Sequence, residues 1–230
     1  MLTKKQNYRK YSSIIEYILS IDPGFKLSDE IQDVILRLNS EIDSSYSKNS
    51  YAVLFYFLAS YFSPKIITEL GVLGCYSIIP LAFGSQNNNQ TFSINGYDLF
   101  EDYSYKSFSY KDALQRIDSF SLKDSIFLEK FDVYSEGFIE EIIQTSDLTH
   151  IDLSHDGKMF ERILTSKIKD DGIIIMEGGS VERDNVEWMQ AYSATKISPV
   201  LEKYSTIRDD LLISVIEEMP SVTVIQSIKK

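Results

Sequence analysis

Short apolar segments alternate with helix-length intervals through most of the chain. Strands separated by such intervals are typical of βαβ units, whose parallel strands share a sheet covered by helices on both faces. The pattern therefore predicts an α/β fold with a Rossmann-like, doubly wound sheet. The strand-like segments of this region are 65–70, 91–97, 125–129, 149–153 and 172–176.

The C-terminal end departs from this alternation. Residues 211–216 and 221–228 both resemble strands, and only residues 217–220 join them. A connection this short cannot cross over a sheet, so the two strands must be antiparallel neighbours. Together with the preceding segments, they predict a mostly parallel, seven-stranded sheet that ends in an antiparallel hairpin.

The first 62 residues have helical periodicity. Apolar positions from Tyr11 to Leu19 share one helical face, and a second helix begins after Ser28, a favourable N-cap. A third helix over 51–62 is apolar nearly all round, which predicts burial. We therefore expect an N-terminal helical extension over 1–62, which covers the site or forms a homodimer interface, followed by the main domain over 63–230.

Composition restricts the classes of partner and site. The 230-residue chain has a formal net charge of −11, which argues against an interface that neutralises nucleic-acid phosphates. The single cysteine excludes an intrachain disulfide and a cysteine-cluster metal site, and two histidines leave almost no room for a multi-histidine site. No signal peptide or apolar run of about 18 residues is recognisable, so we expect a cytoplasmic protein without a membrane span.

A glycine-containing turn follows the first of the central strands. Gly71 and Gly74 lie between an apolar strand and a segment with Pro80 in its expected first helical turn. Such a turn lets the backbone approach a ligand closely and exposes N–H groups at the helix start. The spacing differs from the G-x-G-x-x-G of dinucleotide-binding proteins. The alternative interpretation is a plain strand-to-helix turn.

The second central strand ends at Asp98. In doubly wound folds an acidic residue at this place binds the ribose hydroxyls of a nucleotide cofactor. The alternative is an aspartate that only caps a turn or a helix. An acid and a glycine turn in this order favour a nucleotide-binding site more strongly than either feature alone.

These motifs resemble those of the class I S-adenosylmethionine-dependent methyltransferases. Glu69-x-Gly71 matches that family's glycine-loop motif and Asp98 its second-strand acid, whereas Cys75 stands where a second glycine is common. Asp132 and Val133 follow the third strand, where the family contacts adenine; the alternative is a solvated loop. The resemblance implies a set of cofactor-binding residues: Glu69, Gly71, Gly74, Cys75, Tyr76, Asp98, Asp132, Val133 and Asp152.

The segment 149–156 resembles a stretch found in the small-molecule and sugar O-methyltransferase branch of that family. Two mechanisms follow from the resemblance. In one, His155 at the carboxyl end of a central strand is the general base, because an imidazole titrates close to neutral pH, and Asp152 is a second catalytic residue. In the other, Asp152 and Glu177 bind Mg²⁺, which lowers the pKa of an acceptor hydroxyl. His155 as a structural loop residue is the alternative to both.

The resemblance therefore implies an S-adenosylmethionine-dependent enzyme that O-methylates a small-molecule acceptor, such as a sugar or a secondary metabolite. Four candidates for acceptor contacts follow the fifth strand, where this fold usually places them, but composition alone assigns them no role: Glu182, Arg183, Asp184 and Trp188. Two other functions remain open. One is an NAD- or nucleotide-sugar-linked Rossmann enzyme, and the other is a non-catalytic binding subunit with a cofactor loop weakened by Cys75.

Overall fold

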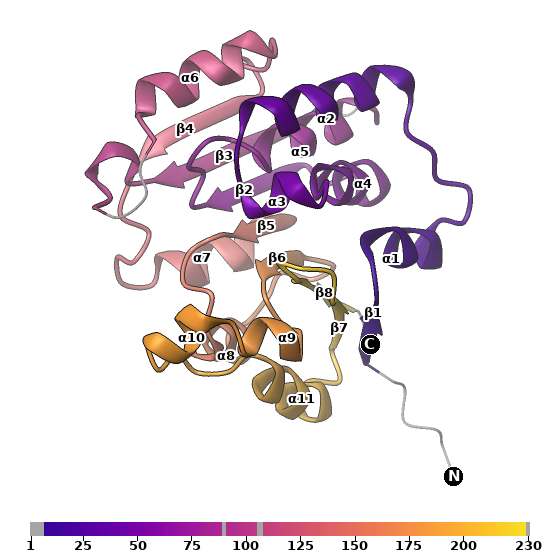
Figure 1. The fold of residues 1–230 in the computed structure, drawn as a ribbon, viewed down its shortest axis with the longest axis vertical. Coiled ribbons are helices and arrows are strands. Elements are labelled where there is room, and N and C mark those ends of the chain that lie inside the picture. The colour runs from indigo at the N-terminus through magenta and orange to yellow at the C-terminus, as the bar shows by residue number, and fades with distance from the viewer. Residues whose placement is uncertain (1–6, 89–90, 105–107, 229–230) are drawn as a thin grey trace.

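A single mixed sheet forms the centre of the computed structural model, which describes residues 7–88, 91–104 and 108–228 (Figure 1). The sheet has eight strands in the order β1-β7-β8-β6-β5-β2-β3-β4. The strands are β1 (Tyr8–Tyr11), β2 (Ile66–Leu70), β3 (Ser93–Asp98), β4 (Ile126–Lys130), β5 (Leu148–Ile151), β6 (Ile173–Glu177), β7 (Leu211–Ile216) and β8 (Val222–Ser227).

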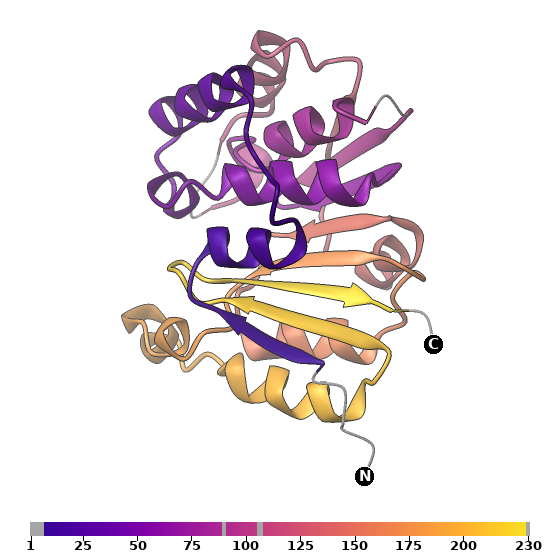
Figure 2. The same cartoon turned by 90° about the vertical axis from the view of Figure 1, so that its right-hand side faces the viewer.

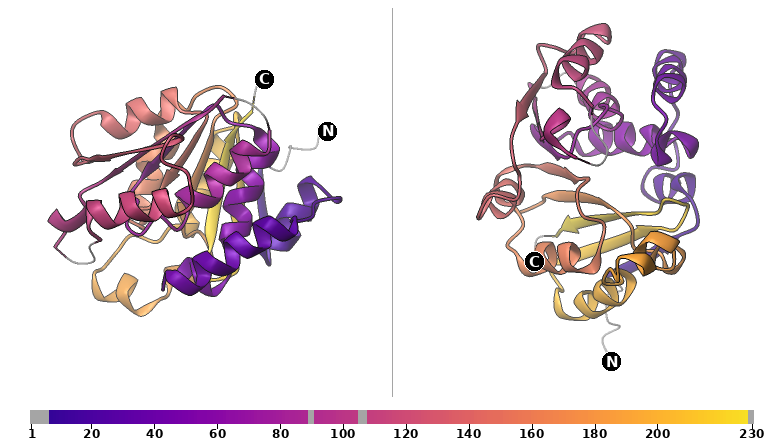
Figure 3. Two further views of the ribbon diagram at one scale, coloured as in Figure 1. Left: turned by 90° about the horizontal axis from the view of Figure 1, so that it is seen from above. Right: turned by 60° about the vertical axis from the view of Figure 1, so that its left-hand side comes forward.

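Helices cover both faces of the sheet, as the view from above shows (Figure 3). Those before or between the first strands are α1 (Ile14–Ile21), α2 (Asp29–Glu41), α3 (Ser45–Lys48), α4 (Ala52–Phe62), α5 (Ile78–Gln86) and α6 (Tyr110–Ser119), with a 3₁₀ turn at Phe100–Asp102. The later helices are α7 (Phe138–Thr145), α8 (Gly157–Thr165), α9 (Val181–Asp184), α10 (Glu187–Ala191) and α11 (Ser198–Ile207).

The predicted doubly wound sheet and its closing hairpin are confirmed. Strands β2 to β6 are parallel, whereas β8 is antiparallel to both β6 and β7. The expectation of an entirely helical N-terminal segment is wrong at one place. Tyr8–Tyr11 forms an eighth strand, which pairs in parallel with β7 at the edge of the sheet (Figure 2). Without this strand, the outer N–H and C=O groups of β7 would lack strand partners.

Two hydrophobic clusters hold the layers together. The N-terminal helices, α5 and α6 pack in one cluster with β2, β3 and β4, and α7, α8 and α11 pack in the other. Helix α4 is buried as predicted, and it approaches α5 so closely that a Cβ at Gly84 would lie 2.4 Å from the Tyr56 carbonyl oxygen. The N-terminal helices are thus part of the main core. Within the described residues, no helix is long and apolar enough to span a membrane.

Backbone hydrogen bonds connect the loops at the carboxyl edge of the sheet. Gly71 N–H donates to Tyr97 O at 2.8 Å, and Asp152 N–H donates to Leu70 O at 2.8 Å. Phe131 N–H donates to Asp98 O at 2.9 Å. These bonds fix the loops after β2, β3, β4 and β5 relative to one another. This is the edge at which ligands bind in open α/β sheets.

Candidate active site

The glycine loop takes an unusual backbone path at three positions. Gly71 has φ +89°, and Leu73 and Cys75 have φ +44° and +67°. A Cβ at Gly71 would lie 2.2 Å from the carbonyl oxygen of Asp152, so only glycine fits between β2 and β5. Cys75 adopts a left-handed conformation in spite of its side chain, at a cost of about 1–2 kcal/mol. The loop therefore keeps a glycine-like backbone path at position 75, although that residue is a cysteine.

The Cys75 side chain packs away from solvent. It is fully buried, and its Sγ lies 3.8 Å from the carbonyl oxygen of Ala113 on α6. Burial raises the pKa of the thiol, with the nearby Glu69 carboxylate adding to the rise. The thiol is therefore protonated at neutral pH and serves as packing for the loop.

Asp98 stabilises the same loop through its carboxylate. Its Oδ2 accepts a hydrogen bond from Leu73 N–H at 2.8 Å, and its Oδ1 accepts one from Phe100 N–H at 2.5 Å. The side chain stays partly exposed at the end of β3, and each carboxylate oxygen can accept a second hydrogen bond. The two interpretations of Asp98 are therefore compatible, since a turn-stabilising carboxylate can also accept hydrogen bonds from a diol.

Other predicted cofactor residues occupy different environments. Arg116 on α6 donates from Nη1 to the Gly74 carbonyl oxygen at 2.7 Å. Tyr76 directs its hydroxyl to Asn39 Oδ1 at 2.7 Å, so its side chain belongs to the packing of the N-terminal helices. Asp132 is exposed after β4 and accepts a hydrogen bond from Tyr134 N–H at 3.0 Å, next to the buried Val133.

A buried polar cluster lies on β2 and β5, at the base of the glycine loop. Glu69 Oε1 contacts His150 Nδ1 at 3.0 Å and accepts a hydrogen bond from Ser77. Burial raises the pKa of the Glu69 carboxyl, and the contact with Glu69 raises the pKa of His150 against the effect of burial. Three buried atoms here have no hydrogen-bond partner among the described residues: Glu69 Oε2, His150 Nε2 and the hydroxyl of Tyr46 on α3.

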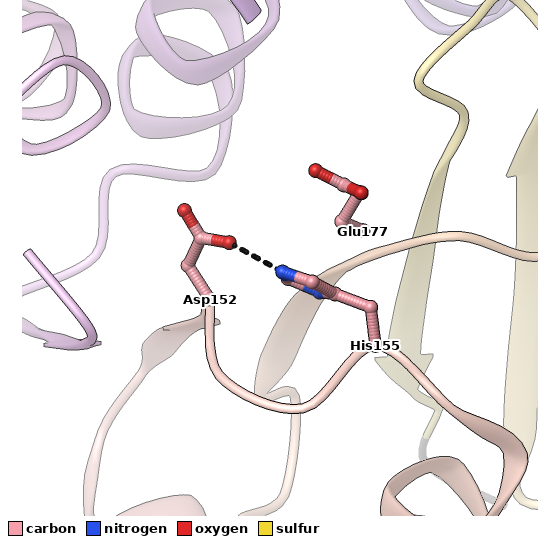
Figure 4. A group of neighbouring side chains, drawn as sticks. All are labelled: Asp152, His155 and Glu177. Carbon is pink, nitrogen blue, oxygen red and sulfur yellow. Dashed lines mark ion pairs between the residues drawn. The ribbon is translucent and has the colours of Figure 1, made fainter. Parts of the chain in front are cut away.

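Asp152, His155 and Glu177 come together at the ends of β5 and β6 (Figure 4). His155 Nε2 lies 3.1 Å from Asp152 Oδ1, and the two side chains are 22% and 26% exposed. Burial lowers the pKa of His155, but the hydrogen bond with Asp152 and the charge of Glu177 outweigh it, so the net shift is upward. The imidazole is thus oriented by one carboxylate, as a general base requires.

Glu177 forms an ion pair with Arg183. Arg183 on α9 donates from Nη2 and Nε to Glu177 Oε1, at 2.5 and 3.1 Å. Its guanidinium carbon lies 4.5 Å from the centre of the Trp188 ring. The neighbouring Asp184 instead accepts hydrogen bonds from Ile197 N–H and Ser198 N–H, so it anchors the start of α11.

The expected Mg²⁺ site can be tested against this arrangement. One ligand atom each from Asp152, His155 and Glu177 lies within 4.8 Å of the other two, which is a span compatible with a metal ion. Mg²⁺ prefers an octahedral set of oxygen ligands, however. Both carboxylates of the predicted pair already have a partner here, since Asp152 Oδ1 contacts His155 Nε2 and the Arg183 guanidinium binds Glu177 Oε1. The residues present do not fit Mg²⁺.

Two contributions to the site could not be found from local sequence. Tyr46 lies far from the other residues in sequence and reaches the site only because α3 packs over the sheet. Arg183 has a suitable position after β6, but its ion pair with Glu177 depends on the turn at Gly178 and Gly179, where φ is +110° and +121°. A pair of adjacent glycines after a strand is a sequence signal for such a turn.

Comparison with known proteins gives the fold. No protein-family model and no curated protein matches the sequence. A methyltransferase from Podospora anserina with bound S-adenosylhomocysteine matches the structure with TM-score 0.60 and 17% identity over 94% of each chain.

Two O-methyltransferases match over nearly their whole length. TomG of Streptomyces achromogenes, in complex with S-adenosylmethionine and involved in tomaymycin synthesis, has TM-score 0.55 and 11% identity over 100% of each chain. An enzyme of Bacillus cereus in complex with S-adenosylhomocysteine has TM-score 0.54 and 15% identity, over 95% of this chain and 98% of that one. The chain has the class I methyltransferase fold.

Proposed function

We propose that this protein is an S-adenosylmethionine-dependent methyltransferase that acts on a hydroxyl group of a small molecule. The observation that carries the proposal is the Asp152–His155 pair at 3.1 Å. It lies at the carboxyl edge of the sheet, against the glycine loop, where a base can meet a methyl donor. The fold shared with O-methyltransferases supports the same conclusion.

The residues at this edge fit the proposed cofactor. Asp98 offers carboxylate oxygens to the ribose hydroxyls, and the exposed Asp132 offers one to the adenine amino group. The buried and unpartnered Glu69 Oε2 is an acceptor suited to an ammonium group. When bound, the cofactor supplies an electrophilic methyl group on a positively charged sulfur.

His155 performs the proton transfer in this proposal. Its imidazole accepts the proton of the acceptor hydroxyl as the oxygen becomes nucleophilic. Asp152 fixes the ring through Nε2 and stabilises the imidazolium that forms, so the opposite nitrogen, Nδ1, is the one that accepts the proton. The loops that are hydrogen-bonded along the sheet edge hold these groups in place, and positioning of this kind provides much of the rate enhancement in a displacement reaction.

The proposal is tested first by cofactor binding. S-Adenosylhomocysteine at a hundred times its dissociation constant should stabilise the protein by about 2.7 kcal/mol, measured by thermal unfolding. NADH at the same concentration should not stabilise it. Stabilisation by NADH alone would support the alternative of an NAD-linked Rossmann enzyme, and stabilisation by neither ligand would support a non-catalytic subunit. Transfer of a labelled methyl group to a panel of phenols and glycosides then identifies the acceptor.

Replacing Asp98 with alanine should weaken S-adenosylhomocysteine binding about tenfold to a hundredfold, measured by calorimetry. The carboxylate is expected to accept ribose hydrogen bonds, and bonds to a charged group contribute about 1.5–3 kcal/mol. Asp124→Ala is the matched control, because Asp124 is an exposed acid before β4, at the opposite edge of the sheet. Equal affinities in the two variants would remove Asp98 from the cofactor site.

A further inference from the structure

A buried arginine binds Glu177, one of the three side chains whose ligand atoms lie close enough together to hold a metal ion. Arg183 is 3% exposed, and its Nη2 lies 2.5 Å from Glu177 Oε1. Glu177 in turn stands beside His155 and Asp152 (Figure 4). The guanidinium is thus a fixed positive charge next to a pair of carboxylates that could otherwise attract a cation.

The guanidinium is held on two sides, by Glu177 and by the Trp188 ring. Glu177 binds its Nε and Nη2, and the Trp188 ring lies 4.5 Å from its central carbon. Among the residues that the structure describes, no acceptor lies within hydrogen-bond reach of the buried Nη1. A buried donor without an acceptor is costly, and a ligand that supplies the acceptor would account for it.

We propose that Arg183 takes the place of a divalent metal ion in this site. Its charge excludes the metal, and its Nη1–H donates to the acceptor oxygen that becomes anionic when His155 removes the proton. A fixed donor aimed at developing negative charge is an established means of stabilising a transition state.

The role toward the acceptor rests on the proposed function, but the exclusion of metal does not. Mn²⁺ binding is therefore measured by electron paramagnetic resonance on the protein both without and with S-adenosylhomocysteine. The wild-type chain should bind no Mn²⁺ at this site. Arg183→Ala should bind Mn²⁺ at least about a hundredfold more tightly than the wild-type chain does. Removing a positive charge at contact distance strongly reduces the electrostatic repulsion of a cation.

Two further variants show whether the gained site is the one described. Arg183→Ala combined with Glu177→Ala should lose Mn²⁺ binding again, since one of the two carboxylates is gone. Arg162→Ala is the matched control and should gain no site. Arg162 on α8 pairs with Glu140 on α7 at 2.6 Å, and among the described residues Glu140 belongs to no group of three metal-ligating side chains.

Each outcome decides the inference. Mn²⁺ bound by the wild-type chain, or no gain in Arg183→Ala when circular dichroism shows the variant folded, would overturn it. A gain that persists without Glu177 would place the metal elsewhere and overturn it as well. Failure of the proposed function can be distinguished from failure of this inference, because the wild-type chain and all variants would then not bind S-adenosylhomocysteine.

Discussion

Replacing Gly71 with alanine is expected to lower the free energy of unfolding by at least about 3 kcal/mol and to abolish S-adenosylhomocysteine binding. A Cβ at this position would lie 2.2 Å from Asp152 O and 3.0 Å from Asp152 C, so the neighbouring backbone must move. The left-handed φ of +89° adds about 1–2 kcal/mol for a residue with a side chain. Urea unfolding and calorimetry measure the two effects.

Gly137→Ala separates the steric cost from the conformational cost. Gly137 also has a left-handed φ, +77°, but a Cβ there would meet no atom of the described residues within 4 Å, so only the backbone strain applies. This variant should lose about 1–2 kcal/mol and keep its cofactor affinity. Equal losses of stability in Gly71→Ala and Gly137→Ala would show that the loop relaxes around the new methyl group. The close approach of Gly71 to Asp152 O would then make no steric contribution to the loss.

The order of strands and helices could be predicted because it depends on periodicity and loop length. Alternating apolar segments gave five parallel strands, and the four-residue connection at 217–220 required an antiparallel pair. The strand at Tyr8–Tyr11 could not be found in this way. It has a single buried residue, Tyr11, and it is extended because it pairs with β7 more than 200 positions away in the sequence.

The acidic residues of the site were predictable by position, but their electrostatics were not. Asp98, Asp152 and Glu177 each lie at the carboxyl end of a strand or just beyond it, as the alternation of elements implied. The partners of these carboxylates depend on turns: Leu73 N–H for Asp98, and Arg183 for Glu177. Sequence spacing predicts which edge of the sheet a carboxylate reaches. Only the folded turns decide whether its partner is a backbone N–H, an imidazole or a guanidinium.

Replacing His155 with glutamine is expected to lower kcat for methyl transfer about a hundredfold to ten-thousandfold, the usual contribution of a general base. S-Adenosylhomocysteine affinity should change little, because the role assigned to His155 is toward the acceptor. The measurement uses an acceptor found in the phenol and glycoside panel. A variant that keeps its kcat would show that His155 is a structural loop residue, the alternative that the sequence left open.

The protonation of His155 gives this prediction a second readout. Asp152 and Glu177 raise the pKa of the imidazole, and Arg183 opposes them, so in the free protein the ring should titrate above the ordinary histidine value of 6.5. A base works only after losing its proton, so a raised pKa moves the rise of activity to higher pH. With two histidines in the chain, one of them fully buried, the ring signals can be followed by NMR and assigned with His155→Gln.

Asp152→Asn should move the His155 midpoint to lower pH, because the amide no longer stabilises the imidazolium. The rate should nevertheless fall, since the neutral side chain holds the ring less firmly and cannot stabilise the charge formed during proton transfer. A lower His155 midpoint together with a lower rate would show that Asp152 orients the imidazole. If Asp152 only adjusted the pKa of His155, the rate at neutral pH would rise, because more of the base would be unprotonated. An unchanged midpoint would mean that the 3.1 Å contact between Asp152 and His155 has no effect on the imidazole.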